Sequence, residues 1–275
     1  MTGGFELIDS PDGYRLRMQM PPELNGVVDA ELFCRGPLLD GSRGNPTVIG
    51  ERMRQMLGGL ALVAPWQVHG TAVQQSRRIW AQPSRVKADG VHFDPSFSQG
   101  TVASLRYGDC TPILIAGDHP RPWALILHSG FRGTLANIAA VCVGRIARYY
   151  GGIDFRRTHA WIGPAIGPCC YTRRLSDPTS PKALALFGNR FCIPEGDHLR
   201  IDLPGIARTQ LADAGIPREN IRSLGMCTSC DKSYFYSYRG GDEEDRMILL
   251  AKVGGGGHKA VANGENICSS RGVVR

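Results

Sequence analysis

Three side chains that can bind a metal ion stand at the ends of apolar runs in this sequence. His69 lies in "WQVHG", just before Gly70, Cys110 precedes "TPILI", and His128 follows "WALIL". Functional groups commonly gather where strands end, so this shared placement favours chemistry over coincidence. Their wide spacing fits no local metal-binding motif, and each residue alone is also typical of a hydrogen-bonded structural histidine or a small buried cysteine. The pattern therefore indicates a site without identifying its reaction.

The segments around these residues predict a mixture of strands and helices. Apolar or alternating runs predict strands at "YRLRMQM", "VVDAELF", "LALVAPWQVHG", "TAVQQSRRIW", "TVASLRYG", "TPILIAG", "WALILHS", "HAWIGPAI", "YFYSYR" and "RMILLAKV". Apolar residues at helical spacing predict helices over 47–58, 134–152 and 203–214. Strands that come partly in a run, with helices partly between them, predict an α+β fold built as a mixed-sheet α/β sandwich. We expect a single catalytic domain over 1–252 and a glycine-rich, irregular tail over 253–275.

Composition and charge narrow the class of protein. The 275 residues are 42% hydrophobic and 21% charged, which is enough for a substantial core. The net charge of +7 is scattered along the chain, so it favours a small anionic ligand over nucleic acid. The chain shows neither a secretory signal nor a run of 18 apolar residues. We therefore expect a cytoplasmic protein with no membrane span, in which cysteines are more often ligands, nucleophiles or core residues than disulfides.

Six segments in fixed order carry a resemblance to a known family. "WQVHG", "GDCTPILI", "HSGFRGT", "IGPAIGPCCY", "MCT" and "FYSYR" together resemble the YfiH-like, laccase-domain family. Its members were described as multi-copper polyphenol oxidases before they were recognised as zinc-dependent purine nucleoside phosphorylases with adenosine deaminase activity. The resemblance covers roughly residues 60–250. It implies a fold like that of the catalytic domain of cytotoxic necrotizing factor toxins.

The resemblance implies that His69, Cys110 and His128 are the metal ligands and catalytic residues. Two imidazoles and one thiolate suit zinc, and three protein ligands leave a fourth coordination position open. Such an ion brings the pKa of bound water toward about 7, which would serve deamination at C6 of adenosine. The implied substrates are phosphate and purine nucleosides: adenosine, inosine, guanosine and methylthioadenosine. We expect a monomer or a small homo-oligomer.

Arginines are the expected phosphate and substrate contacts. Arg132 lies in "SGFRG" at a predicted helix start, where a guanidinium and helix amides together can bind an anion. The family also uses arginines in its N-terminal part. Arg35 corresponds to the first, and Arg52 or Arg54 to the second, with the register left open. Departures from the family pattern, such as Gly240 after "SYR", leave substrate preference undetermined.

Two other enzyme classes and one non-enzymatic class remain as alternatives. Cys110 could be the nucleophile of a hydrolase with His128 as its base, acting on an amide or a peptidoglycan precursor. A copper-dependent, laccase-like polyphenol oxidase would use the same two histidines and cysteine, with copper as an adventitious ion. Seven histidines without an H-x-H pair exclude a trinuclear copper cluster. The third alternative is an interaction protein with a vestigial site.

The remaining cysteines give weaker signals. Cys227 and Cys230 form a C-x-x-C pair, but no second such pair follows it, so we interpret Cys230 as incidental. The adjacent Cys169 and Cys170 are expected to be buried or to line a pocket.

Overall fold

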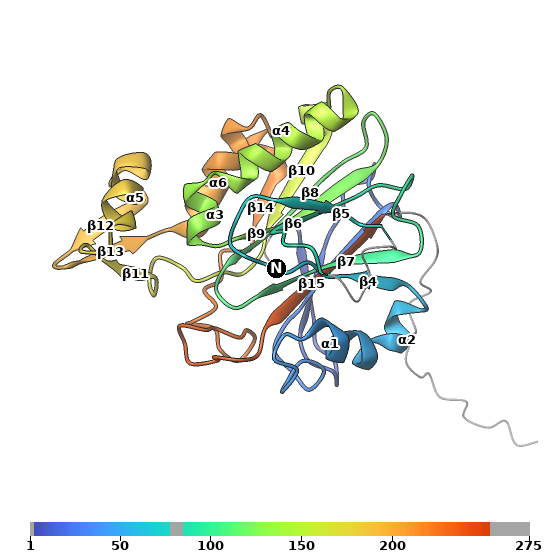
Figure 1. Cartoon of the computed structure of the whole chain (residues 1–275), viewed down its shortest axis with the longest axis horizontal. Coiled ribbons are helices and arrows are strands. Elements are labelled where there is room, and N and C mark those ends of the chain that lie inside the picture. Colours follow the sequence, from blue (N-terminus) through green and yellow to red (C-terminus); the bar gives the residue numbers. More distant parts are fainter. Residues whose placement is uncertain (1–2, 78–84, 254–275) are drawn as a thin grey trace, which may run out of the picture.

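The computed structural model describes residues 3–77 and 85–253, which build two six-stranded mixed sheets packed face to face (Figure 1). The first sheet has the spatial order β1 (Phe5–Ile8), β2 (Arg15–Met18), β3 (Val28–Phe33), β15 (Met247–Val253), β7 (Thr101–Tyr107) and β4 (Ala61–Val63). Neighbouring strands are antiparallel except β4 and β7. The short helices α1 (Pro46–Arg52) and α2 (Arg54–Leu57) contribute Ile49 and Leu57 to its core, and Met53 between them is also buried there.

The second sheet carries the predicted site. Its order is β14 (Ile221–Ser223), β10 (Thr158–Ile162), β8 (Thr111–Gly117), β9 (Trp123–Ser129), β6 (Gly90–Phe93) and β5 (Val73–Gln75). Three helices lie along the outer face of this sheet: α3 (Phe131–Leu135), α4 (Ile138–Tyr150) and α6 (Leu203–Asp213) (Figure 1). The 3-10 turns η2 (Phe155–Arg157) and η3 (Arg218–Asn220) precede β10 and β14.

The alternation of side chains between two covered faces explains why the sequence of β8 is apolar without interruption from Pro112 to Ala116. Leu114 and Ala116 join the core between the two sheets, whereas Ile113 and Ile115 pack with residues of α4 and α6. Successive side chains of a strand point to opposite faces, and here both faces are covered. All seven residues of β8 are accordingly buried.

A small third sheet extends the molecule on one side (Figure 1). It has the order β11 (Thr172–Arg174), β13 (His198–Ile201) and β12 (Cys192–Glu195), and α5 (Thr179–Phe187) packs against it. Within the described residues, no helix is both long and apolar enough to cross a bilayer.

The predicted α+β, mixed-sheet sandwich is confirmed, while several element boundaries were wrong. The helix predicted over 134–152 is divided at Asn137, which adopts a left-handed φ of 52° and caps α4 by accepting a hydrogen bond from the Ala140 amide at 3.2 Å. The helix predicted over 47–58 is interrupted at Met53.

The strand predictions at three places were also too long or wrong. The strand predicted over 60–70 is limited to Ala61–Val63, and the next one to Val73–Gln75. "YFYSYR" forms turns rather than a strand. Residues 78–80 of the strand predicted over 71–80 lie outside the described residues. The same is true of residues 254–275 of the predicted tail.

Candidate metal centre and its pocket

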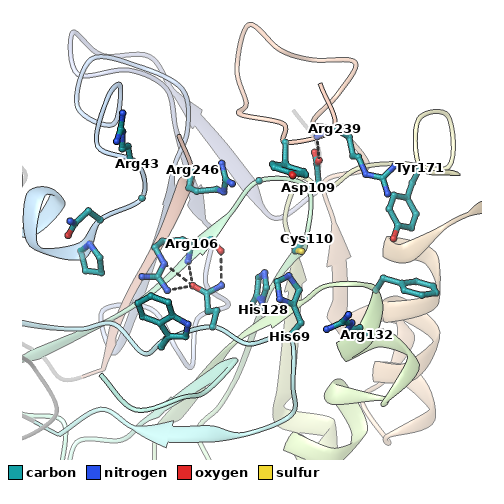
Figure 2. A pocket seen from close by; sticks show the side chains of 18 of the residues that line it. Arg43, His69, Arg106, Asp109, Cys110, His128, Arg132, Tyr171, Arg239 and Arg246 are labelled. Carbon is teal, nitrogen blue, oxygen red and sulfur yellow. Dashed lines mark hydrogen bonds between the residues drawn. The ribbon is translucent and has the colours of Figure 1, made fainter. Parts of the chain in front are cut away.

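Pairing of β8 with β9 brings two of the three predicted ligands together. Pro112 lies opposite His128 in this antiparallel register, so Cys110, two residues before Pro112, reaches the same end of the sheet. His69 approaches from the loop after β4 (Figure 2). The ligand atoms of His69, Cys110 and His128 all lie within 4.8 Å of one another. The structure therefore gathers the three residues into one group that could hold a metal ion.

A buried carboxylate, Asp89, fixes the loop that carries His69. The backbone amides of Val68, His69 and Gly70 donate hydrogen bonds to the Asp89 carboxylate over 3.2, 2.9 and 2.7 Å. His69 itself has a left-handed φ of 61°, which is uncommon for a residue other than glycine. The three hydrogen bonds stabilise this conformation and so direct the imidazole toward Cys110 and His128.

Asp89 also orients His128. Its Oδ1 lies 2.9 Å from His128 Nδ1, and both side chains are buried. Burial lowers the pKa of His128 by more than the hydrogen bond to Asp89 raises it. A neutral ring that donates its Nδ1 proton to Asp89 keeps Nε2 as an acceptor, which is the usual carboxylate–histidine–metal arrangement.

Two observations bear on whether a metal ion fits between His69, Cys110 and His128: the close approach of Gly130 and the chemistry of the Cys110 thiol. A Cβ atom added at Gly130 would lie 2.8 Å from Cys110 Sγ and 2.8 Å from His69 Cδ2, so glycine is needed at this point of the cradle. Burial, together with the negative charges of Asp109 and Asp89, raises the pKa of Cys110 to about 12. A bound cation would stabilise the thiolate form, and one thiolate with two imidazoles suits zinc or copper.

The residue before Cys110 anchors the turn between β7 and β8. Asp109 has a φ of 94° and a buried side chain. Its carboxylate accepts hydrogen bonds from Thr228 Oγ1 at 2.7 Å, Ser237 Oγ at 2.6 Å and the Arg239 amide at 2.7 Å. Cys110 is thereby tied to the chain segment that follows β14.

A pocket of about 890 Å³ opens onto His69, Cys110 and His128 (Figure 2). Its lining is strongly basic, because two carboxylates, Asp109 and Asp177, face seven guanidinium groups. Those groups belong to Arg43, Arg85, Arg106, Arg132, Arg173, Arg239 and Arg246. The pocket also presents four aromatic side chains, those of Trp66, Phe131, Tyr171 and Tyr238. Cations beside aromatic faces suit a ligand that combines an anion with a planar ring.

Arg106 and Arg132 differ in their contacts with the rest of the protein. Arg106 donates to Gln67 Oε1 and to the Pro65 carbonyl, and burial together with the charges of Arg85 and Arg246 lowers its pKa to about 9. Arg132, by contrast, is exposed on the pocket wall and makes no ion pair or side-chain hydrogen bond with any residue that the structure describes. Its guanidinium is therefore available to a ligand.

Comparison with known proteins identifies the family. The family model described as multi-copper polyphenol oxidoreductase laccase matches residues 45–253. The chain belongs to this family. Its sequence is similar to the purine nucleoside phosphorylase YlmD of Geobacillus stearothermophilus, with 32% identity over 68% of this chain and 70% of that protein. It is also similar to the adenosine deaminase RL5 of an unknown prokaryotic organism, with 28% identity over 65% and 69% of the two chains.

A solved member of the family shows the same fold. The crystal structure of the Bacillus licheniformis hypothetical protein YfiH has a TM-score of 0.76 and 25% identity, covering 92% of this chain and all of that one. This agreement confirms that the chain resembles the YfiH-like proteins.

The structure does not bring the two predicted N-terminal arginines of the family pattern, Arg35 and Arg52, to this pocket. Arg35 forms an ion pair with Asp242 at 2.6 Å and lies over the Tyr236 ring at 4.5 Å. Arg52 donates to the Leu38 carbonyl at 2.9 Å. Because both guanidinium groups already contact protein atoms elsewhere, the geometry gives no support to their predicted role in substrate binding.

Sequence reasoning missed several residues that build the site. Asp89, in "KADGVHF", is a lone acid just before an apolar strand, a position that could have suggested a functional carboxylate. Arg43, Arg106 and Arg246 gave no usable signal, because scattered arginines are also typical of a solvated surface.

Proposed function

We propose that this protein is a metal-dependent purine nucleoside phosphorylase that also deaminates adenosine, with zinc bound by His69, Cys110 and His128. Support comes chiefly from a single observation: one pocket combines this ligand group with an unpaired guanidinium and aromatic faces. The proposed substrates are phosphate with adenosine, inosine, guanosine or methylthioadenosine. The activity names of the relatives agree with this assignment. We place the reaction in the cytoplasm, without nucleic-acid or membrane partners.

The side chains of the pocket fit the two parts of such a substrate pair. Arg132 would bind phosphate, and the rings of Phe131 and Tyr171, whose centroids are 6.2 Å apart, would pack against the purine. In phosphorolysis a phosphate oxygen bonds to C1′ while the C1′–N9 bond breaks. The purine leaves with the electron pair and takes up a proton. A zinc ion in this site would supply Lewis-acid activation of water for the deamination.

The cysteine-hydrolase alternative has less support from the geometry. A nucleophilic thiolate needs a lowered pKa or a base that accepts its proton. Burial raises the pKa of Cys110 to about 12 and lowers that of His128, so neither group favours a thiolate–imidazolium pair in the absence of a metal ion. Copper-dependent phenol oxidation remains the second candidate, because the ligand set and the family description both admit copper.

The test is a phosphate requirement measured on protein with a known metal content. Inosine should be converted to hypoxanthine and ribose 1-phosphate when phosphate is present, and adenosine should release ammonia with or without phosphate. Removal of the metal with a chelator should stop both reactions, and zinc should restore them. Free ribose formed equally well without phosphate would contradict phosphorolysis. Phenol oxidation by the copper-loaded protein, without any nucleoside conversion, would favour the second candidate.

A further inference from the structure

Four cysteines outside the proposed active site gather at a second place in the fold. Cys169 and Cys170 lie between β10 and β11, and Cys227 and Cys230 lie in the segment after β14. All four Sγ atoms are within 4.8 Å of one another. This finding corrects the interpretation of Cys230 as incidental, since the partner pair of its C-x-x-C motif is the distant "CC" of "GPCCY".

The sulfur spacings match a shared metal ion better than a disulfide. Cys230 Sγ lies 3.5 Å from Cys169 Sγ and 3.4 Å from Cys170 Sγ. A tetrahedral ion with Zn–S bonds of about 2.3 Å separates its sulfur ligands by roughly 3.8 Å, whereas a disulfide needs about 2.05 Å. The observed distances lie within a few tenths of an ångström of the metal geometry.

The backbone around Cys227 supplies the hydrogen bonds that a thiolate ligand needs. The Gly167 amide donates a hydrogen bond to Cys227 Sγ at 3.2 Å, and the amides of Cys230 and Asp231 donate to the Cys227 carbonyl at 3.2 and 2.9 Å. An amide that donates to the first sulfur of a C-x-x-C pair stabilises its negative charge and fixes its direction. The backbone bonds to the Cys227 carbonyl fix the turn that places Cys230 beside it.

We propose that Cys169, Cys170, Cys227 and Cys230 bind one zinc ion as a closed tetrathiolate site. Four thiolates fill the tetrahedral coordination and leave no position for a substrate, so the role of this ion is structural. Binding replaces four S–H protons with four Zn–S bonds, releases those protons to solvent, and leaves a net charge of −2 on the site.

The position of this zinc site indicates which parts of the chain the ion would hold together. Tyr171, which lines the pocket, directly follows Cys170. Thr228, between Cys227 and Cys230, donates to Asp109 beside Cys110. The ion would thus join two chain segments that are far apart in the sequence and that together support one wall of the pocket. This proposal does not depend on the proposed reaction.

Zinc stoichiometry of the full chain tests the proposal. Protein produced with ample zinc should contain two zinc ions per chain. Cys110→Ala and Cys230→Ser should each retain one, and the double variant should retain none. Cys34→Ala, at a buried cysteine that belongs to neither group of ligands, is the matched control and should retain two. One zinc per chain that Cys110→Ala removes completely would overturn the proposal.

A second measurement needs no substitution and so does not depend on how a variant folds. Cys169 and Cys230 are exposed, so as thiols they should react rapidly with iodoacetamide. In the zinc-loaded native protein they should stay unmodified until a chelator is added, and peptide mass analysis would locate the labels. Immediate labelling of both residues in zinc-loaded protein would refute the site, as would a disulfide among the four cysteines.

Discussion

Replacing Gly130 with alanine tests the packing of the proposed active-site ligands with the smallest available change. Gly130 has φ −81° and ψ 177°, an extended conformation that alanine adopts without strain. The added Cβ would nevertheless lie 2.8 Å from both Cys110 Sγ and His69 Cδ2. Ordinary carbon contacts lie at about 3.5–4.0 Å, so one or both ligands must move by roughly 0.7–1.2 Å. Metal–ligand distances tolerate only about 0.2 Å.

The expected loss can be bounded from residues that merely support ligands. Removing such a residue costs about 10- to 100-fold in metal affinity, and displacing a ligand should cost at least the upper value. We therefore expect Gly130→Ala to lower metal affinity by about 100-fold or more, or about 3 kcal/mol. Gly133→Ala is the control, because its Cβ meets Ile138 Cγ2 at 3.5 Å and the Gly70 carbonyl at 3.6 Å, both ordinary contacts.

The assay is metal content after dialysis, followed by chelator competition. Gly130→Ala should lose one equivalent of metal relative to Gly133→Ala, while the melting temperatures of the two metal-free proteins stay close. Equal metal affinity in both variants would refute the reasoning, because it would mean that His69 and Cys110 do not bind the ion from the positions they have in this structure. A large fall in the metal-free melting temperature of Gly130→Ala alone would instead show that the glycine serves the fold.

Three further predictions concern Asp89, Arg132 and His92. Asp89→Asn should lower metal affinity by about 10- to 100-fold through the loss of the carboxylate that orients His128, and unchanged chelator competition would exclude that role. Arg132→Ala should raise the apparent KM for phosphate by roughly 10- to 150-fold and affect deamination less, whereas Arg52→Ala should leave it unchanged. An equal fall in both activities would argue against a phosphate contact. Burial lowers the pKa of His92 from 6.5 to about 4, so protons favour the unfolded chain as the pH falls through this range. Through His92 alone, the free energy of unfolding should drop by on the order of 3 kcal/mol between these pH values. His92→Gln should lack this drop in urea titrations, and identical pH profiles would contradict it.

Local pattern was sufficient for the central strands and insufficient for the boundaries of other elements. The apolar runs that became β7, β8 and β9 are bounded by glycine, serine or turn residues and are covered on both faces, so their composition alone marks them. The helix predicted across Asn137 failed because a single side-chain cap stabilises a left-handed residue there. The strand predicted through His69 failed because the Asp89 carboxylate takes three backbone amides that a sheet ladder would otherwise use.

Residues that act together across long separations were the hardest to predict. Family motifs located the His69, Cys110 and His128 group, which the structure then brought together. Nothing local relates the cysteines of "GPCCY" to those of "CTSC", since their meeting depends on how β10 and β14 pair in parallel at one edge of the second sheet. The basic lining of the pocket is likewise a product of topology, because it combines elements far apart in the sequence, such as strand β7 with Arg106, helix α3 with Arg132 and strand β11 with Arg173.

The close packing of guanidinium groups in the pocket lowers the stability of the ligand-free protein and favours the binding of anions. Like charges held close together repel: burial lowers the pKa of Arg106, and the neighbouring charges of Arg85 and Arg246 lower it further. A bound anion relieves it, so phosphate or sulfate in a buffer should raise the melting temperature by mass action. Substitutions that remove some of these positive charges would raise the melting temperature of the ligand-free protein. The same substitutions would lower its affinity for anions. Evolution toward thermal tolerance and evolution toward efficient substrate capture would thus act in opposite directions on the same arginines.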